Sequence, residues 1–177
     1  MVKGFVIRGL FSVWLTRGPE NLLAMLNTIP GVELEIEDHG TWPNSFGHVG
    51  SITQRARSYK LNHHKVVLIG HSFGATSAIM VNNNLRNMDI DVDLLCPIDP
   101  AAQYSTAVSN TNQKVIGFFQ REPMQLGQGI DVKGSGWTAA EWKARVVQYE
   151  RYESHIAIVN DPWVHGKIRS AVASLAA

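Results

Sequence analysis

Short apolar runs alternate along the chain with segments in which apolar residues recur every three or four positions. The apolar runs predict β-strands, and they occupy residues 2–8, 32–37, 66–69, 92–98, 115–119 and 146–152. The helical spacing predicts amphipathic helices, which occupy residues 18–29, about 45–59, 73 to about 85, and 161–175. The asparagines at 82–84 are expected to end the third helix, and Gly and Gln residues between 120 and 138 indicate a surface loop.

Strands separated by helices or long connections predict an α/β fold with a mostly parallel sheet of about six strands. The uninterrupted run at 66–69 is typical of a parallel strand that is buried on both faces. The run at 2–8 is expected to be a buried strand at the edge of the fold. No repeat or change of composition marks a boundary, so residues 1–177 are expected to form one domain without a separate cap.

A serine follows the apolar run at 66–69 in the pentapeptide Gly70-His71-Ser72-Phe73-Gly74, and a helix rich in small residues follows it directly. This G-x-S-x-G pattern between a strand and a helix is typical of the nucleophile elbow of α/β-hydrolases. The two glycines lack the Cβ atoms that would clash in so sharp a turn. A serine hydroxyl is a weak nucleophile and needs a general base, which we look for further along the chain.

The base is expected C-terminal to Ser72, because the triad order in this fold is serine, acid, histidine. Only His155 and His165 follow Ser72 in the sequence. His165 falls inside the last predicted helix, whereas His155 lies just past the last predicted strand. Active sites of open α/β sheets collect at the carboxyl ends of the strands, so we predict that His155 is the base.

Two carboxylates compete for the role of the triad acid. Asp99 ends the strand after the serine, and Glu122 follows the next strand, while Asp131 in the long loop stays open. Pro100 favours an extended conformation at Asp99, and Glu122 has one more rotatable bond to immobilise. These arguments favour Asp99 without excluding Glu122.

Residues 70–75, Gly-His-Ser-Phe-Gly-Ala, and residues 98–101, Ile-Asp-Pro-Ala, form a pair of motifs. The pair resembles the G-H-S-L-G-A and L-D-P-A motifs of pancreatic-type lipases, which are α/β-hydrolases. The resemblance covers about residues 68–102 and the position of His155. It implies that Asp99 is the triad acid. The chain departs from that family because it has no disulfides, no lipid-binding second domain and no long lid.

An oxyanion hole requires two backbone N–H groups. The resemblance to α/β-hydrolases implies Phe73 as one donor and Leu10, or Phe11 if the loop is shifted, as the other. Arg8 stands where the family usually has a histidine, and it could anchor that loop or lie near the site.

A second polar and aromatic segment follows the run at 32–37. There His39 and Trp42, together with Phe11, are candidates to line the substrate pocket, although a packed loop explains them equally well. No metal-binding or nucleotide-binding motif occurs, so we expect no metal and no cofactor.

Composition excludes other classes of protein. The net charge is +1, and no cluster of positive residues suggests nucleic-acid binding. The single cysteine, Cys96, excludes an intrachain disulfide and is expected to be an inert core residue. No run reaches the roughly 18 apolar residues of a membrane span. No signal peptide is visible, so a cytoplasmic location is expected, with export that needs no cleaved signal as the open alternative.

The sequence therefore predicts a serine hydrolase that cleaves carboxylic esters, similar to esterases and lipases, and that takes a small-molecule or lipid-like ester. An acyl thioesterase is the main alternative, because the same groups cleave thioesters. A non-catalytic interaction module on the same fold is the alternative from another class. The acyl chain, the alcohol and the oligomeric state are not indicated.

Overall fold

The computed structural model describes residues 1–9, 16–38, 46–101, 107–109, 113–120 and 144–177. The described strands are β1 (Val2–Arg8), β2 (Val32–Asp38), β3 (Lys65–His71), β4 (Leu94–Ile98), β5 (Lys114–Gln120) and β6 (Val146–Arg151). The described helices are α2 (Gly18–Leu26), α3 (Val49–Leu61), α4 (Phe73–Arg86), the short 3-10 helix η1 (Ile158–Asn160) and α6 (Pro162–Ala176).

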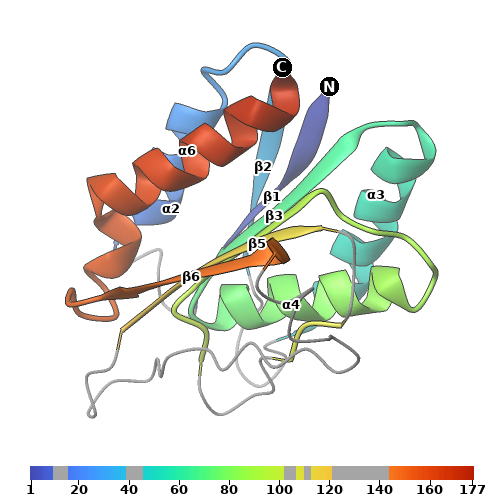
Figure 1. The fold of residues 1–177 in the computed structure, drawn as a ribbon. Helices are drawn as coiled ribbons and strands as arrows, with labels where there is room; N and C mark the ends of the chain where they lie inside the picture. The colour runs from blue at the N-terminus through green and yellow to red at the C-terminus, as the bar shows by residue number, and fades with distance from the viewer. Residues whose placement is uncertain (10–15, 39–45, 102–106, 110–112, 121–143) are drawn as a thin grey trace.

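The six strands form one sheet in the order β2-β1-β3-β4-β5-β6, and every pair of neighbours is parallel. Helices α2 and α6 cover one face of the sheet, and α3 and α4 cover the other (Figure 1). The predicted α/β fold with a six-stranded sheet is confirmed.

Each face of the sheet packs a hydrophobic core against its helices. Along β3, Val67 and Ile69 pack with α2 and α6, whereas Val66 and Leu68 pack with α3 and α4. Successive side chains of a strand point to opposite faces, so two covered faces require the continuous apolar run seen in the sequence.

The first strand is buried, as expected, but the expectation that it lies at the edge of the fold is wrong. Strand β1 lies between β2 and β3, with Val6 in register with Ile36 on one side and Ile69 on the other. The described edge strands are β2 and β6. In β2 the glutamates alternate with apolar residues, and Glu35 and Glu37 accept hydrogen bonds from Arg55 of α3.

Two helix boundaries differ from the expected ones. Helix α3 begins at Val49 rather than near residue 45. Helix α4 continues through the three asparagines to Arg86. The Asn83 side chain donates to the carbonyl of Ala107 at 2.8 Å and accepts from the N–H of Ser109 at 2.9 Å. The Asn83 side chain therefore forms hydrogen bonds with backbone groups of a neighbouring segment and does not end its own helix.

Parallel pairing brings the carboxyl ends of all six strands to one edge of the sheet, which we call the carboxyl edge. This edge is where ligands bind in open α/β sheets. Among the described residues, no helix is both long enough and apolar enough to cross a membrane.

Candidate active site

Ser72 occupies the sharp turn between β3 and α4. Its backbone angles are φ 58° and ψ −124°, a left-handed conformation that costs a residue with a side chain on the order of 1–3 kcal/mol. The Ser72 N–H donates to the carbonyl of Ile98 on β4 at 3.0 Å. The turn is therefore tied to the neighbouring strand.

Glycines make this turn possible. A Cβ on Gly70 would lie 2.2 Å from the carbonyl oxygen of Gly74, and a Cβ on Gly74 would lie 2.2 Å from the carbonyl oxygen of Ile7. A Cβ on Gly9, just past β1, would lie 2.8 Å from the Cβ of Ser72. The end of β1 thus passes directly beside the turn, which leaves no room for a side chain at Gly9 or Gly74. At Gly70 the space is taken by the backbone of Gly74 itself.

His155 lies in the turn after β6 and faces Ser72. Its Nε2 is 2.9 Å from the Ser72 Oγ, although the two residues are 83 positions apart. His155 and Ser72 are buried, with 7% and 5% of their surfaces exposed. The other candidate, His165, directs its Nε2 to the carbonyl of Val159 at 2.7 Å. The structure therefore brings His155, and not His165, to the serine.

Asp99 lies immediately after β4 and completes a chain of three side chains. One carboxylate oxygen, Oδ2, is 2.7 Å from the His155 Nδ1. The other, Oδ1, accepts a 3.4 Å hydrogen bond from the Gln120 N–H at the end of β5. Asp99 is fully buried, so its charge faces these donors rather than water.

The expected extended conformation of Asp99 is wrong. Its φ is 44°, in the left-handed region. The N–H of Asp99 still donates to the carbonyl of Phe118 on β5 at 2.7 Å, so the residue stays tied to the neighbouring strand. An aspartate tolerates a left-handed φ better than most residues with side chains.

The Asp99 carboxylate orients the His155 ring. A carboxylate only accepts hydrogen bonds, so the Nδ1 of His155 carries a hydrogen that it donates to Asp99. When the imidazole is neutral, its lone pair is on Nε2, where it can accept a hydrogen bond from the Ser72 hydroxyl. This arrangement can remove a proton from the serine oxygen.

His71 is a residue of this site that sequence reasoning missed. It is 3% exposed, its ring lies 4.8 Å from the His155 ring, and its Nε2 is 2.8 Å from the His155 carbonyl oxygen. Burial and the neighbouring His155 lower the pKa of His71 to about 3. The available signal was a polar residue at the end of a continuous apolar strand, directly before the serine.

Several predicted residues fall outside the described part of the chain, namely Leu10, Phe11, His39, Trp42, Glu122 and Asp131. Phe73 is described and forms the first residue of α4, directly after Ser72. Arg8 pairs with Glu20 at 2.8 Å and Asp38 at 3.0 Å. It therefore anchors the end of β1 to α2 and β2.

Metal binding and a cysteine nucleophile find little support in the described residues. Among them, no group of three or more His, Cys, Asp or Glu side chains could hold a metal ion. Cys96 is fully buried in β4, and burial raises the pKa of its thiol well above its usual range. A thiol that stays protonated is a poor nucleophile.

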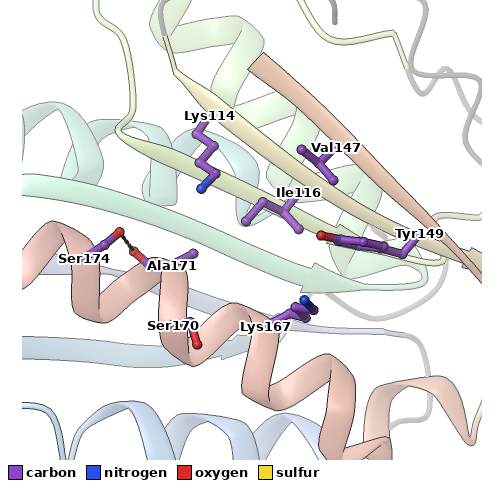
Figure 2. A pocket seen from close by; sticks show the side chains of 8 residues that line it. All are labelled: Lys114, Ile116, Val147, Tyr149, Lys167, Ser170, Ala171 and Ser174. Atoms are coloured by element: carbon purple, nitrogen blue, oxygen red, sulfur yellow. Dashed lines mark hydrogen bonds between the residues drawn. The ribbon is translucent and has the colours of Figure 1, made fainter. Parts of the chain in front are cut away.

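A pocket of about 300 Å³ lies apart from Ser72, Asp99 and His155, between α6 and strands β5 and β6. Figure 2 shows Lys114 and Ile116 of β5, Val147 and Tyr149 of β6, and Lys167 of α6 around it. Its lining includes the hydroxyl residues Ser170 and Ser174 but none of those three residues.

Solved structures superpose on nearly the whole chain. A protein from Xanthomonas campestris pv. campestris that is assigned to the hydrolases of the alpha/beta superfamily is 17% identical, with a TM-score of 0.67, and the match covers 98% of this chain and 96% of that one. An esterase of Pyrobaculum calidifontis is 12% identical, with a TM-score of 0.63 and coverage of 99% and 77%. The NocB thioesterase domain of the nocardicin cluster is 15% identical, with a TM-score of 0.59 and coverage of 96% and 93%. The chain has the α/β-hydrolase fold. No protein-family model and no curated protein matches the sequence.

The order of the site residues agrees with the α/β-hydrolase fold. Ser72, Asp99 and His155 follow one another along the chain in the order in which this fold places nucleophile, acid and base. In the α/β-hydrolase fold the nucleophile lies on the strand-to-helix turn, which is where Ser72 lies between β3 and α4.

Proposed function

We propose that the protein is a serine hydrolase that cleaves carboxylic esters. The observation that carries the proposal is the buried chain of hydrogen bonds from Asp99 through His155 to Ser72, with distances of 2.7 Å and 2.9 Å. The fold and the similarity to hydrolases and esterases support it. The proposal includes a single domain without a cap, so that substrate reaches Ser72 directly.

The proposed reaction is acyl transfer to water in two halves. The Ser72 oxygen attacks the ester carbonyl while His155 takes the hydroxyl proton at Nε2. The tetrahedral intermediate collapses, and His155 returns the proton to the leaving alkoxide, which departs as an alcohol. A water molecule then attacks the acyl-enzyme, His155 takes its proton and returns it to the Ser72 oxygen, and the carboxylic acid leaves.

Asp99 and the oxyanion donors have supporting roles in the proposal. Asp99 holds the Nδ1–H tautomer of His155 and stabilises the imidazolium that forms. The Phe73 N–H lies at the N-terminus of α4, where the helix dipole favours negative charge. We propose Phe73 and Leu10, or Phe11 in its place, as the two donors to the oxyanion.

A thioesterase is the second candidate, because thioesterases occur among the structural neighbours. The test compares p-nitrophenyl esters of increasing acyl length with acyl-CoA thioesters of the same lengths. Higher kcat/KM on the oxygen esters supports the first proposal, and higher kcat/KM on the thioesters supports the second. Ser72→Ala is the control for both substrate series.

A fluorophosphonate probe tests the shared chemistry. Labelling of the wild-type protein at Ser72, and its loss in Ser72→Ala, would support a reactive serine. An unlabelled wild-type protein with no turnover on either series would favour a non-catalytic interaction module.

A further inference from the structure

His71 is a buried, ionisable side chain that the proposed reaction does not use. It belongs to the last residue of β3 and immediately precedes Ser72. Its ring is tilted by 33° against the His155 ring, with 4.8 Å between the ring centres. Its position beside both the nucleophile and the base requires a physical explanation.

The partner of His71 fixes its protonation state. The carbonyl oxygen of His155 can only accept a hydrogen bond, so the His71 Nε2, at 2.8 Å, must carry a hydrogen. The His71 Nδ1 is buried and has no hydrogen-bond partner among the described residues. A second proton would have to be buried there without a partner, so the ring is neutral with its hydrogen on Nε2.

The hydrogen bond joins two segments that must keep a fixed separation. His155 lies in a turn, and its carbonyl oxygen accepts a hydrogen bond from His71, which is 84 positions earlier in the sequence. The Nε2 of the same His155 contacts Ser72, the neighbour of His71. The base is thus held by its ring and by its backbone to two consecutive residues of the nucleophile turn.

A neutral His71 also suits the charge that develops during the proposed reaction. His155 becomes an imidazolium when it takes the serine proton. A protonated His71 ring 4.8 Å away would oppose this charge, whereas a neutral ring does not.

We propose that His71 is a positioning residue whose Nε2–H holds the His155 carbonyl and so keeps the His155 ring aligned with the Ser72 oxygen. The inference rests on the proposed hydrolase function, because it assigns a role toward the base of that site.

Three substitutions separate the hydrogen bond from the volume of the ring. In His71→Gln, an amide N–H lies the same number of bonds from the backbone as Nε2. In His71→Asn the donor is one bond too short to reach, and in His71→Met a chain of similar length has no donor. We expect kcat to fall about tenfold to a hundredfold in the Asn and Met variants, because alignment of the base is lost. KM should change less than about twofold, since His71 contacts no substrate, and His71→Gln should retain most of the wild-type kcat.

Activity is expressed per reactive serine, titrated with the fluorophosphonate probe, so that a loss of folded protein is not counted as a loss of catalysis. Equal kcat in all three variants and wild type would overturn the proposal. A loss of kcat that follows urea stability and is not rescued by Gln would reduce His71 to a structural role and would also overturn it.

If the variants fail to fold, a measurement on the wild-type protein tests the hydrogen bond from His71 to His155 directly. Nitrogen-15 NMR of the histidine rings should show His71 with its hydrogen on Nε2 and none on Nδ1. The opposite tautomer would exclude the hydrogen bond and the proposal with it. An unreactive wild-type protein with the expected tautomer would instead reject the hydrolase function while leaving the contact in place.

Discussion

Two regions of the molecule present serine hydroxyls next to basic side chains, and they differ in what holds those hydroxyls. At the carboxyl edge, the Ser72 hydroxyl faces the Nε2 of the His155 imidazole at 2.9 Å. In the pocket beneath α6, the Ser170 hydroxyl donates to the Gly166 carbonyl at 2.9 Å. The Ser174 hydroxyl donates to the Ala171 carbonyl at 2.7 Å (Figure 2).

The difference lies in the backbone. Ser170 and Ser174 are on a regular helix, where a serine oxygen can bond a carbonyl of the preceding turn. Ser72 has a positive φ at the end of a strand, which turns its side chain away from such carbonyls and toward His155. An open pocket with hydroxyls and lysines is therefore a weaker indication of catalysis than a strained serine with an oriented base.

Replacing the two kinds of serine gives the largest expected contrast. Ser72→Ala should abolish ester turnover with little change in the free energy of unfolding, because the hydroxyl has a chemical role. The matched control, Ser170→Ala, should keep the wild-type rate, because its hydroxyl only bonds its own helix. Turnover of p-nitrophenyl esters and urea unfolding measure the two quantities. Full activity in Ser72→Ala would reject the proposed mechanism.

Removing the charge of the acid should have the next largest effect. Asp99→Asn keeps the shape but changes the tautomer that His155 adopts, which in a serine triad lowers kcat about 10⁴-fold. Glu122→Gln, the matched control at the competing carboxylate, should change kcat little. The opposite result would move the acid to the segment after β5 and weaken the comparison with pancreatic-type lipases. Steady-state kinetics on one ester decide between them.

The sequence predicted those parts of the fold and site that depend on local patterns. Continuous apolar strands, helical spacing and the glycines around Ser72 determine the α/β class and the turn, and these depend on neighbours in the chain. The position of β1 within the sheet is set by pairing with strands distant in the sequence, and it was predicted incorrectly, as was the extended conformation of Asp99. The contact of His71 with His155 was missed for the same reason, because it joins residues 84 positions apart. The catalytic roles of Ser72, His155 and Asp99 remain predictions.

Glycines in the two regions should respond to substitution in opposite directions. Gly74→Ala places a Cβ within 2.2 Å and 2.5 Å of the Ile7 and Arg8 carbonyl oxygens, so α4 must move away from β1. We expect it to lower the free energy of unfolding by at least about 2 kcal/mol. In Gly166→Ala the added Cβ meets nothing within 4 Å on α6, and the helix should gain about 0.5–1 kcal/mol. Urea unfolding of both variants checks the prediction, and equal stabilities would contradict it.

The buried His71 should also make stability depend on pH. Its pKa is about 3 in the folded protein, where burial and His155 disfavour the charged ring, and about 6.5 in the unfolded chain. Between these values the unfolded chain binds the extra proton, so the free energy of unfolding rises with pH. The free energy of unfolding that depends on a neutral His71 is fully present above pH ~6.5. It is lost progressively as the pH falls toward 3, by at most about 1.4 kcal/mol per pH unit.

Substitution of His71 should flatten this dependence. In His71→Gln we expect a smaller slope of unfolding free energy against pH between about 4 and 6.5, because the proton taken up on unfolding is gone. Gly166→Ala is the matched control: it changes stability without removing an ionisable group, so its curve should run parallel to that of the wild type. Urea unfolding at intervals across this range measures both slopes. Parallel curves for His71→Gln and wild type would mean that His71 becomes protonated inside the folded protein, which its unpartnered Nδ1 in a buried position argues against.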